Sequence, residues 1–158
     1  MDKKGLSEIT KSITDLIMPF VFMFGLYLLF FGHLSPGGGF AAGVILAGVF
    51  ILITLAFGKG GVEIYINRER SHLFEAAGAL LFLFVACSGI FTGKGFFTNV
   101  LHQEFGSRYF RFLSGGNIVL YNIGIALKVM AGLFMVFFIL SVTRVVLEGT
   151  KLKMRRRK

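Results

Sequence analysis

Apolar residues along the chain form four long stretches, each able to cross a bilayer as a helix. They run from about Ile13 to Phe31, from Phe40 to about Gly58, from about Leu73 to Phe91 and from about Ile118 to Leu140. A helix that crosses a hydrocarbon core of about 30 Å needs about 20 largely apolar residues, and these stretches meet that length. They do not alternate apolar and polar residues as a membrane β-strand does, so a helical bundle is predicted.

The links between the four stretches are short or modest, and most of the charged residues lie in these links or in the terminal segments. The links cover residues 32–39, 59–72 and 92–117, and none suggests a soluble domain. Residues 1–158 are therefore predicted to form one all-α membrane domain, a bundle of four transmembrane helices, which ends in a basic tail over 141–158. The first stretch lacks a convincing cleavage site and is expected to remain as a helix.

Lysine and arginine residues are concentrated on one predicted side of the membrane. Thirteen of them fall in the two terminal segments and in the link over 59–72, whereas only Lys94, Arg108 and Arg111 fall on the opposite side. Because positively charged segments are retained in the cytoplasm, both termini are predicted to be cytoplasmic. The basic segment from Lys151 to Lys158 acts as a topology anchor in this interpretation, and contact with anionic lipid is the alternative.

The composition excludes several classes of protein. Hydrophobic residues make up 55% of the chain and charged residues only 16%, unlike a soluble domain. The net charge of +9 is explained by topology and lipid, so nucleic-acid binding is not expected. The single cysteine, Cys87, supports neither an intrachain disulfide nor a cysteine metal site. We recognise no catalytic arrangement or cofactor motif, so independent catalysis, a cofactor and a bound metal are not expected.

Lys128 is the most informative charged residue, because it lies in the middle of the fourth apolar stretch. An unpaired charge at that depth costs at least about 3 kcal/mol, so the ammonium group must face a polar partner. Gly124 and Gly132 lie one helical turn away on either side, and Tyr121 lies toward the outer end, so this face suits close helix packing. The expected partner is a carboxylate of another subunit. Two roles stay open: part of an ion path, or a static salt bridge.

Three consecutive glycines mark the first link, in the run Gly32-His33-Leu34-Ser35-Pro36-Gly37-Gly38-Gly39-Phe40. Glycines permit close backbone approaches, and Gly39, Gly43 and Ala47 continue as a stripe of small residues at four-residue spacing. The pattern favours a tight hairpin packed against neighbouring helices. The functional alternative is His33, a residue of a titratable type, which is expected at the extracytoplasmic mouth of a proton or cation path.

Two acidic residues are secondary candidates. Asp15 lies four residues before Pro19, and a proline inside a helix leaves that earlier carbonyl without its hydrogen-bond donor. Glu75 stands at the start of the third apolar stretch. Solvation at the membrane interface is the simpler explanation for both carboxylates.

A motif in the first half of the chain is similar to a known family. A helix with Pro19 and Tyr27 is followed by Gly-His, two further residues, Pro-Gly-Gly-Gly-Phe and a nearby glycine, Gly43. This run resembles the MnhB/MrpB subunit of Mrp-type sodium/proton antiporters and its homologues in membrane-bound hydrogenase-type complexes. The similarity is clear over residues 13–58 and looser over 117–132. Many relatives carry an acidic residue where this chain has Asn122, which leaves both kinds of assembly open.

The resemblance implies a membrane subunit of a multi-subunit cation/proton antiporter module in a prokaryotic cell membrane. Its partners are other membrane subunits, the lipid bilayer, sodium and protons. In this interpretation the ion path uses Lys128 and His33, with secondary candidates Asp15, Glu75, Tyr121 and Asn122. The alternative is a structural subunit whose tight loop and glycines hold larger antiporter-like subunits together. The residues expected to serve packing are Pro36, Gly37, Gly38, Gly39, Gly43, Gly124 and Gly132.

Overall fold

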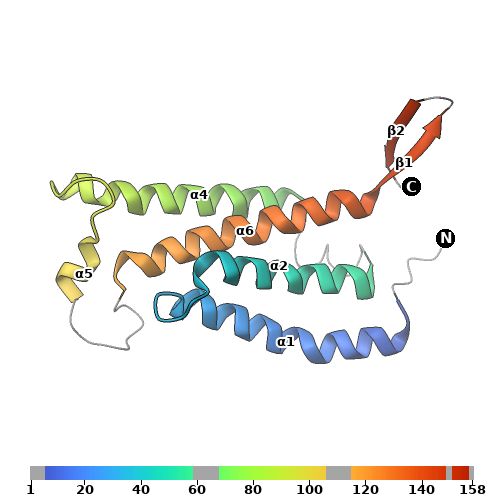
Figure 1. Ribbon diagram of the computed structural model, residues 1–158, viewed down its shortest axis with the longest axis horizontal. Coiled ribbons are helices and arrows are strands. Elements are labelled where there is room, and N and C mark those ends of the chain that lie inside the picture. Colours follow the sequence, from blue (N-terminus) through green and yellow to red (C-terminus); the bar gives the residue numbers. More distant parts are fainter. Residues whose placement is uncertain (1–5, 59–67, 106–114, 149–150, 157–158) are drawn as a thin grey trace.

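A computed structural model describes residues 6–58, 68–105, 115–148 and 151–156 (Figure 1). Four long helices dominate these residues: α1 (Glu8–Phe31), α2 (Gly38–Phe57), α4 (Arg68–Phe91) and α6 (Asn117–Val142). A short helix, α5 (Val100–Phe105), lies between α4 and α6, and two strands, β1 (Thr143–Glu148) and β2 (Lys151–Arg156), follow α6.

Each of the four long helices is long and apolar enough to cross a membrane, with a mean hydropathy between 2.0 and 2.6. Helices suit lipid because their backbone N–H and C=O groups bond within the segment. By the length and hydropathy of the helices, the prediction of a multi-pass membrane protein with four such helices is confirmed. Two helices begin five residues before their apolar stretches: α1 at Glu8, where the Ser7 hydroxyl accepts a bond from the Thr10 N–H (3.4 Å), and α4 at Arg68.

The long helices lie side by side in the order α4, α6, α2, α1 (Figure 1). α6 packs against α4 on one side and against α2 on the other, and α1 packs against α2. Both chain termini lie at one end of this row, which we call the terminal end. α5 and the turn between α1 and α2 lie at the opposite end, which we call the loop end.

Small residues let α2 approach α6 closely. A methyl group added to Gly43 would lie 2.8 Å from the carbonyl oxygen of Ala126, so no larger residue fits there without a shift of the backbone. Further toward the terminal end, Val49 and Ile53 of α2 pack with Phe134 of α6, whose side chain is 1% exposed. This contact is one of the buried apolar clusters that hold α2 against α6.

α4 is displaced toward the loop end relative to α6. The side chains of Glu75 and Lys128 meet across these helices and set the two residues at one level. From that level α4 extends seven residues back to Arg68, whereas α6 extends fourteen residues on to Val142. At 1.5 Å per residue, α6 therefore continues about 10 Å past the start of α4. Figure 1 shows the same step: α4 starts well short of the terminal ends of α1, α2 and α6.

The tail after α6 contains a β-hairpin that the sequence analysis did not predict. β1 and β2 pair in antiparallel register, with Thr143 opposite Arg156 and Glu148 opposite Lys151. β-branched residues such as Val145 and Val146 favour a strand, and this local preference was hidden by the basic charge of the tail. The all-α prediction therefore holds for the four long helices and not for the tail.

Candidate functional site

Lys128 and Glu75 form an ion pair between α6 and α4. Lys128 Nζ lies 3.4 Å from Glu75 Oε1 and donates a hydrogen bond to it. Lys128 stands eleven residues after Asn117, about 16 Å along α6, and so near the middle of a hydrocarbon core of about 30 Å. The side chain of Lys128 is 53% exposed and that of Glu75 is 38% exposed. The pair thus lies on the outside of this chain at membrane depth.

Within this chain the carboxylate of Glu75 faces Lys128, a contact that the sequence analysis did not predict, and a further carboxylate from another subunit stays a prediction. Glu75 was expected at the start of its helix, but α4 begins at Arg68, which places Glu75 two turns inside it. An ammonium without a partner at this depth would cost at least about 3 kcal/mol, and a carboxylate on the neighbouring helix offsets part of that cost.

Two glycines set the close approach of α4 and α6 beside this pair. A methyl group added to Gly78 would lie 2.6 Å from the carbonyl oxygen of Gly124 and 2.8 Å from the amide nitrogen of Lys128. A methyl group added to Gly124 would lie 2.9 Å from the carbonyl oxygen of Gly78. The backbones touch here, and Glu75 lies three residues from Gly78 while Lys128 lies four residues from Gly124. The glycine contact therefore positions the ion pair.

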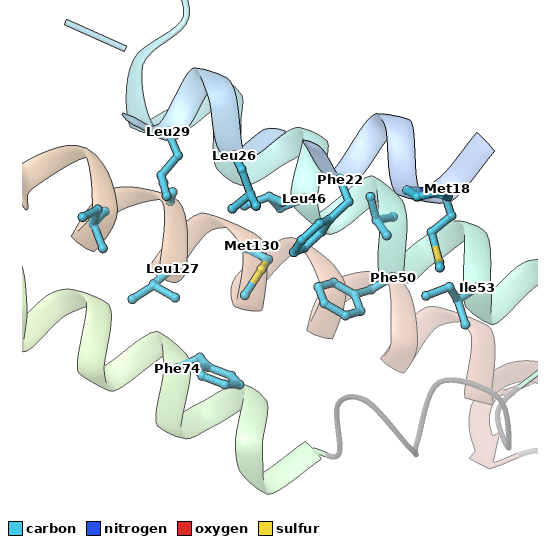
Figure 2. A pocket seen from close by; sticks show the side chains of 14 residues that line it. Met18, Phe22, Leu26, Leu29, Leu46, Phe50, Ile53, Phe74, Leu127 and Met130 are labelled. Atoms are coloured by element: carbon cyan, nitrogen blue, oxygen red, sulfur yellow. The ribbon is translucent and has the colours of Figure 1, made fainter. Parts of the chain in front are cut away.

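The contact between α4 and α6 has two unlike faces. Take an interface residue on a helix and count in one direction along the chain. The residues three and four positions away lie on opposite sides of a line drawn through that residue parallel to the helix axis. Phe74 and Leu127 flank the two glycines on the face toward α1, where they line an apolar groove of about 580 Å³ (Figure 2). Glu75 and Lys128 flank the glycines on the other face, which we call the charged face.

The groove is lined entirely by apolar residues. Its walls come from α1 and α4 and its floor from α2 and α6, with Phe22, Phe50 and Met130 among the side chains that Figure 2 shows. Such a surface offers no ligand to a cation. Any ion chemistry at this depth belongs to the charged face.

Asn122 joins the glycine loop to α6 at the loop end. Its Oδ1 accepts a hydrogen bond from the backbone N–H of Gly39 (3.1 Å), and its side chain is buried. A methyl group on Gly39 would lie 2.5 Å from the carbonyl oxygen of Asn122, and one on Gly32 would lie 2.7 Å from Cα of Gly38. Gly38 itself has φ of +65°, a conformation that favours glycine. These contacts require glycine at three positions of the loop.

The other loop residues have simpler surroundings. Gly37 lies against the side chain of Leu28, and Pro36 is exposed. The ring of His33 lies against Gly115, where an added methyl group would be 3.0 Å from Cγ of the imidazole. Gly115 precedes α6, so the structure places His33 at the loop end. Lys128 lies thirteen residues after Gly115, and the structure does not bring His33 to it.

The remaining candidates lie apart from the ion pair. Asp15 is exposed on α1, toward the terminal end. Tyr121 packs its ring against Phe82 (5.1 Å between centroids) and Phe97 (5.6 Å), two turns from Lys128 toward the loop end. The Tyr121 hydroxyl is buried, and the side chain of Asn117, one turn earlier on α6, is its polar neighbour. Gly132, one turn from Lys128 on the terminal side, has open space where a side chain would stand.

An asparagine network at the loop end was missed by the sequence analysis. Asn99 Oδ1 accepts a hydrogen bond from the Asn117 N–H (2.9 Å), and Asn99 Nδ2 donates to the carbonyl of Gly115 (3.1 Å). Asn117 in turn accepts from the Leu101 N–H (3.2 Å) and donates to the carbonyl of Thr98 (3.1 Å). The bonds connect residues about sixteen to nineteen positions apart, which no local pattern in the sequence reveals.

Within the described part of the chain, no group of three or more His, Cys, Asp or Glu residues is arranged to hold a metal ion. His102 lies on α5, and Glu104 follows two residues later. The single cysteine, Cys87, is a free thiol that is partly exposed.

Comparison with known proteins identifies the family. The domain described as related to the MnhB subunit of Na+/H+ antiporter matches residues 9–135. Protein MJ1307 of Methanocaldococcus jannaschii is 32% identical over 152 residues, which cover 92% of this chain but only 57% of that relative. The putative antiporter subunits mnhB2 of Staphylococcus haemolyticus and Staphylococcus epidermidis are 30% and 31% identical over 136 residues, covering 84% of this chain and 93% of each relative. The resemblance seen in the sequence is thereby confirmed, and the chain belongs to the family of MnhB-related domains.

Proposed function

We propose that this protein is one membrane subunit of a multi-subunit sodium/proton antiporter and that its charged face forms part of the ion path. The family and the mnhB2 relatives support the antiporter, and the family description alone supplies the identity of the ions, Na+ and H+. The Lys128–Glu75 pair is the observation that supports the path.

The exposure of the ion pair argues that this subunit does not face lipid on its charged face. Charged groups within the hydrocarbon face a bundle interior, a water-filled cavity or a polar partner. Lys128 and Glu75 are about half exposed in this chain at membrane depth. A neighbouring subunit or water between subunits must therefore complete their surroundings, and a pair of titratable groups at such a boundary suits ion transfer.

The proposed assembly sits in a prokaryotic cell membrane with the terminal end in the cytoplasm. The excess of Lys and Arg in the terminal segments supports this orientation. Its partners are other antiporter subunits. The sequence resemblance also suggests an alternative assembly, a hydrogenase-type complex. The subunits that co-purify with the tagged protein distinguish an antiporter from a hydrogenase-type complex.

Sodium-dependent proton movement in membrane vesicles that contain the whole complex tests the path. Lys128→Met should reduce the transport rate at least tenfold, measured per amount of assembled complex. Lys11→Met is the matched control, because Lys11 also pairs with a glutamate, Glu8 at 2.9 Å, but near the terminal end of α1. That control should transport normally. Normal transport by an assembled Lys128→Met complex would exclude the charged face from the path.

A structural role is the second candidate, in which the tightly packed helices of this chain support larger subunits. Gly39, Gly43, Gly78 and Gly124 bring backbones together so closely that larger residues do not fit. If the subunit only holds larger subunits together, substitutions at these glycines should lower assembly and transport in parallel, while Lys128→Met leaves both unchanged. The two functions therefore differ in the response of the ion pair.

A further inference from the structure

The displaced start of α4 carries charged and titratable residues to membrane depth. Glu69, Arg70 and His72 are all exposed in the first turns of α4. Along the axis of α4, His72 lies three residues, or about 4.5 Å, from Glu75 in the direction of the terminal end. Since α6 continues about 10 Å past the start of α4, these residues lie beside the apolar middle of α6 rather than at its end.

Polar side chains at that depth need water or a polar partner, because the hydrocarbon offers neither. A purely lipid-exposed position would leave three such residues, within four positions of the chain, without solvation. The beginning of α4 is therefore reached by a polar environment from the terminal side.

His72 continues the charged face toward the terminal end. Residues three apart on a helix share a face, so His72 lies on the same side of α4 as Glu75. Across the contact, Gly132 lies one turn from Lys128 on α6, again toward the terminal end. Apart from the neighbouring backbone of α6 itself, no described atom lies within 4 Å of the place where a Gly132 side chain would begin. The missing side chain leaves open space on α6, one turn from Lys128 toward the terminal end.

The opposite face gives no comparable access. Phe74 and Leu127 close it, and the groove beyond them is lined only by apolar side chains. At the loop end, the rings of Phe82, Phe97 and Tyr121 pack together two turns beyond the ion pair. Water therefore has a polar approach to the pair from the terminal side and an aromatic barrier on the loop side.

We infer that His72, Glu75 and Lys128 form a water-accessible file on the charged face, open to the terminal side through the space at Gly132. The file would pass protons, or hydrated small cations, between that side and the middle of the membrane. The ion-conducting role of this file rests on the proposed function. The water access itself stands on the geometry of α4 and α6.

Thiol labelling of the assembled complex tests the access without measuring transport. In a Cys87→Ser background, His72→Cys should react with a charged, membrane-impermeant maleimide added from the terminal side, and not from the loop side. Leu52→Cys is the matched control, because Leu52 is a partly exposed residue of α2 nearer the terminal end, outside the charged face. Labelling of His72→Cys should be at least tenfold faster than labelling of Leu52→Cys.

Filling the space at Gly132 provides the second measurement. Gly132→Leu should slow the labelling of His72→Cys at least fivefold, whereas Gly132→Ala should leave it nearly unchanged. Absence of labelling at His72→Cys from the terminal side would overturn the file, as would equal rates at Leu52→Cys. If His72→Cys is labelled as expected but Lys128→Met transports normally, the access stands and the proposed transport role fails.

Discussion

Gly78 and Gly124 touch backbone to backbone where α4 crosses α6, and neither has room for a methyl group. The carbonyl oxygen of Gly124 lies 2.6 Å from the place where a Cβ of residue 78 would stand, and that of Gly78 lies 2.9 Å from the corresponding place at residue 124. α4 packs mainly against α6. This pair of glycines therefore controls how α4 attaches to the rest of the subunit.

A larger side chain at this contact should separate α4 from α6. Gly124→Val should cost at least about 2 kcal/mol, because the extra atoms overlap backbone that cannot turn away. The thermal unfolding midpoint of the purified complex measures the loss. Gly132→Ala is the control on the same helix, since its added methyl group contacts nothing within 4 Å, and it should leave the midpoint unchanged. Equal midpoints for both variants would contradict the observed contact.

The two members of the ion pair should depend on each other. Glu75→Gln alone leaves the Lys128 ammonium uncompensated at membrane depth, which should destabilise the complex by about 3 kcal/mol. Combining Glu75→Gln with Lys128→Met removes the charge as well and should restore most of the stability. Transport should stay lost in the double variant if the pair carries ions. A double variant no more stable than the single one would show that the residues do not interact.

The hydrogen bond that Asn122 Oδ1 accepts from the Gly39 N–H should contribute more to stability than the Nδ2 group of the same side chain. Asn122→Ala leaves the buried N–H of Gly39 without an acceptor and should cost about 1–3 kcal/mol. Asn122→Asp keeps an oxygen acceptor in the same place, and the Asn122 Nδ2 that it removes has no hydrogen-bond partner among the described residues. The aspartate variant should therefore unfold at a higher temperature than the alanine variant. The reverse order would argue against this bond.

Sequence reasoning located the four helices because each needs only a local property, a run of about 20 apolar residues. It also placed Lys128 at membrane depth, since position within a run is again local. It did not find that Glu75 faces Lys128. That contact depends on the relative shift of α4 and α6, which the Gly78–Gly124 contact sets across 46 positions of sequence.

Charge misled the sequence analysis at two places. Residues 68–72 were assigned to a link because they include Arg68, Glu69, Arg70 and His72, yet α4 begins at Arg68. The basic residues of the tail likewise concealed the pairing of β1 with β2. In both segments the backbone forms regular structure that charge does not forbid. A rule based on polarity identifies what lipid tolerates rather than where a helix or strand ends.

The asparagine network at the loop end should hold the segment between α4 and α6 in place. Asn117 is 2% exposed and bonds the Leu101 N–H and the carbonyl of Thr98, so Asn117→Ala removes both partners from buried backbone groups. Hydrogen exchange at the Leu101 amide should accelerate at least tenfold, while exchange within α2 stays slow. Thr98→Val is the control, because the Thr98 hydroxyl is exposed and bonds only carbonyls of its own turn, at Lys94 and Gly95. Exchange at Leu101 that is equally fast in both variants would mean that the turn, and not Asn117, holds this segment against α6.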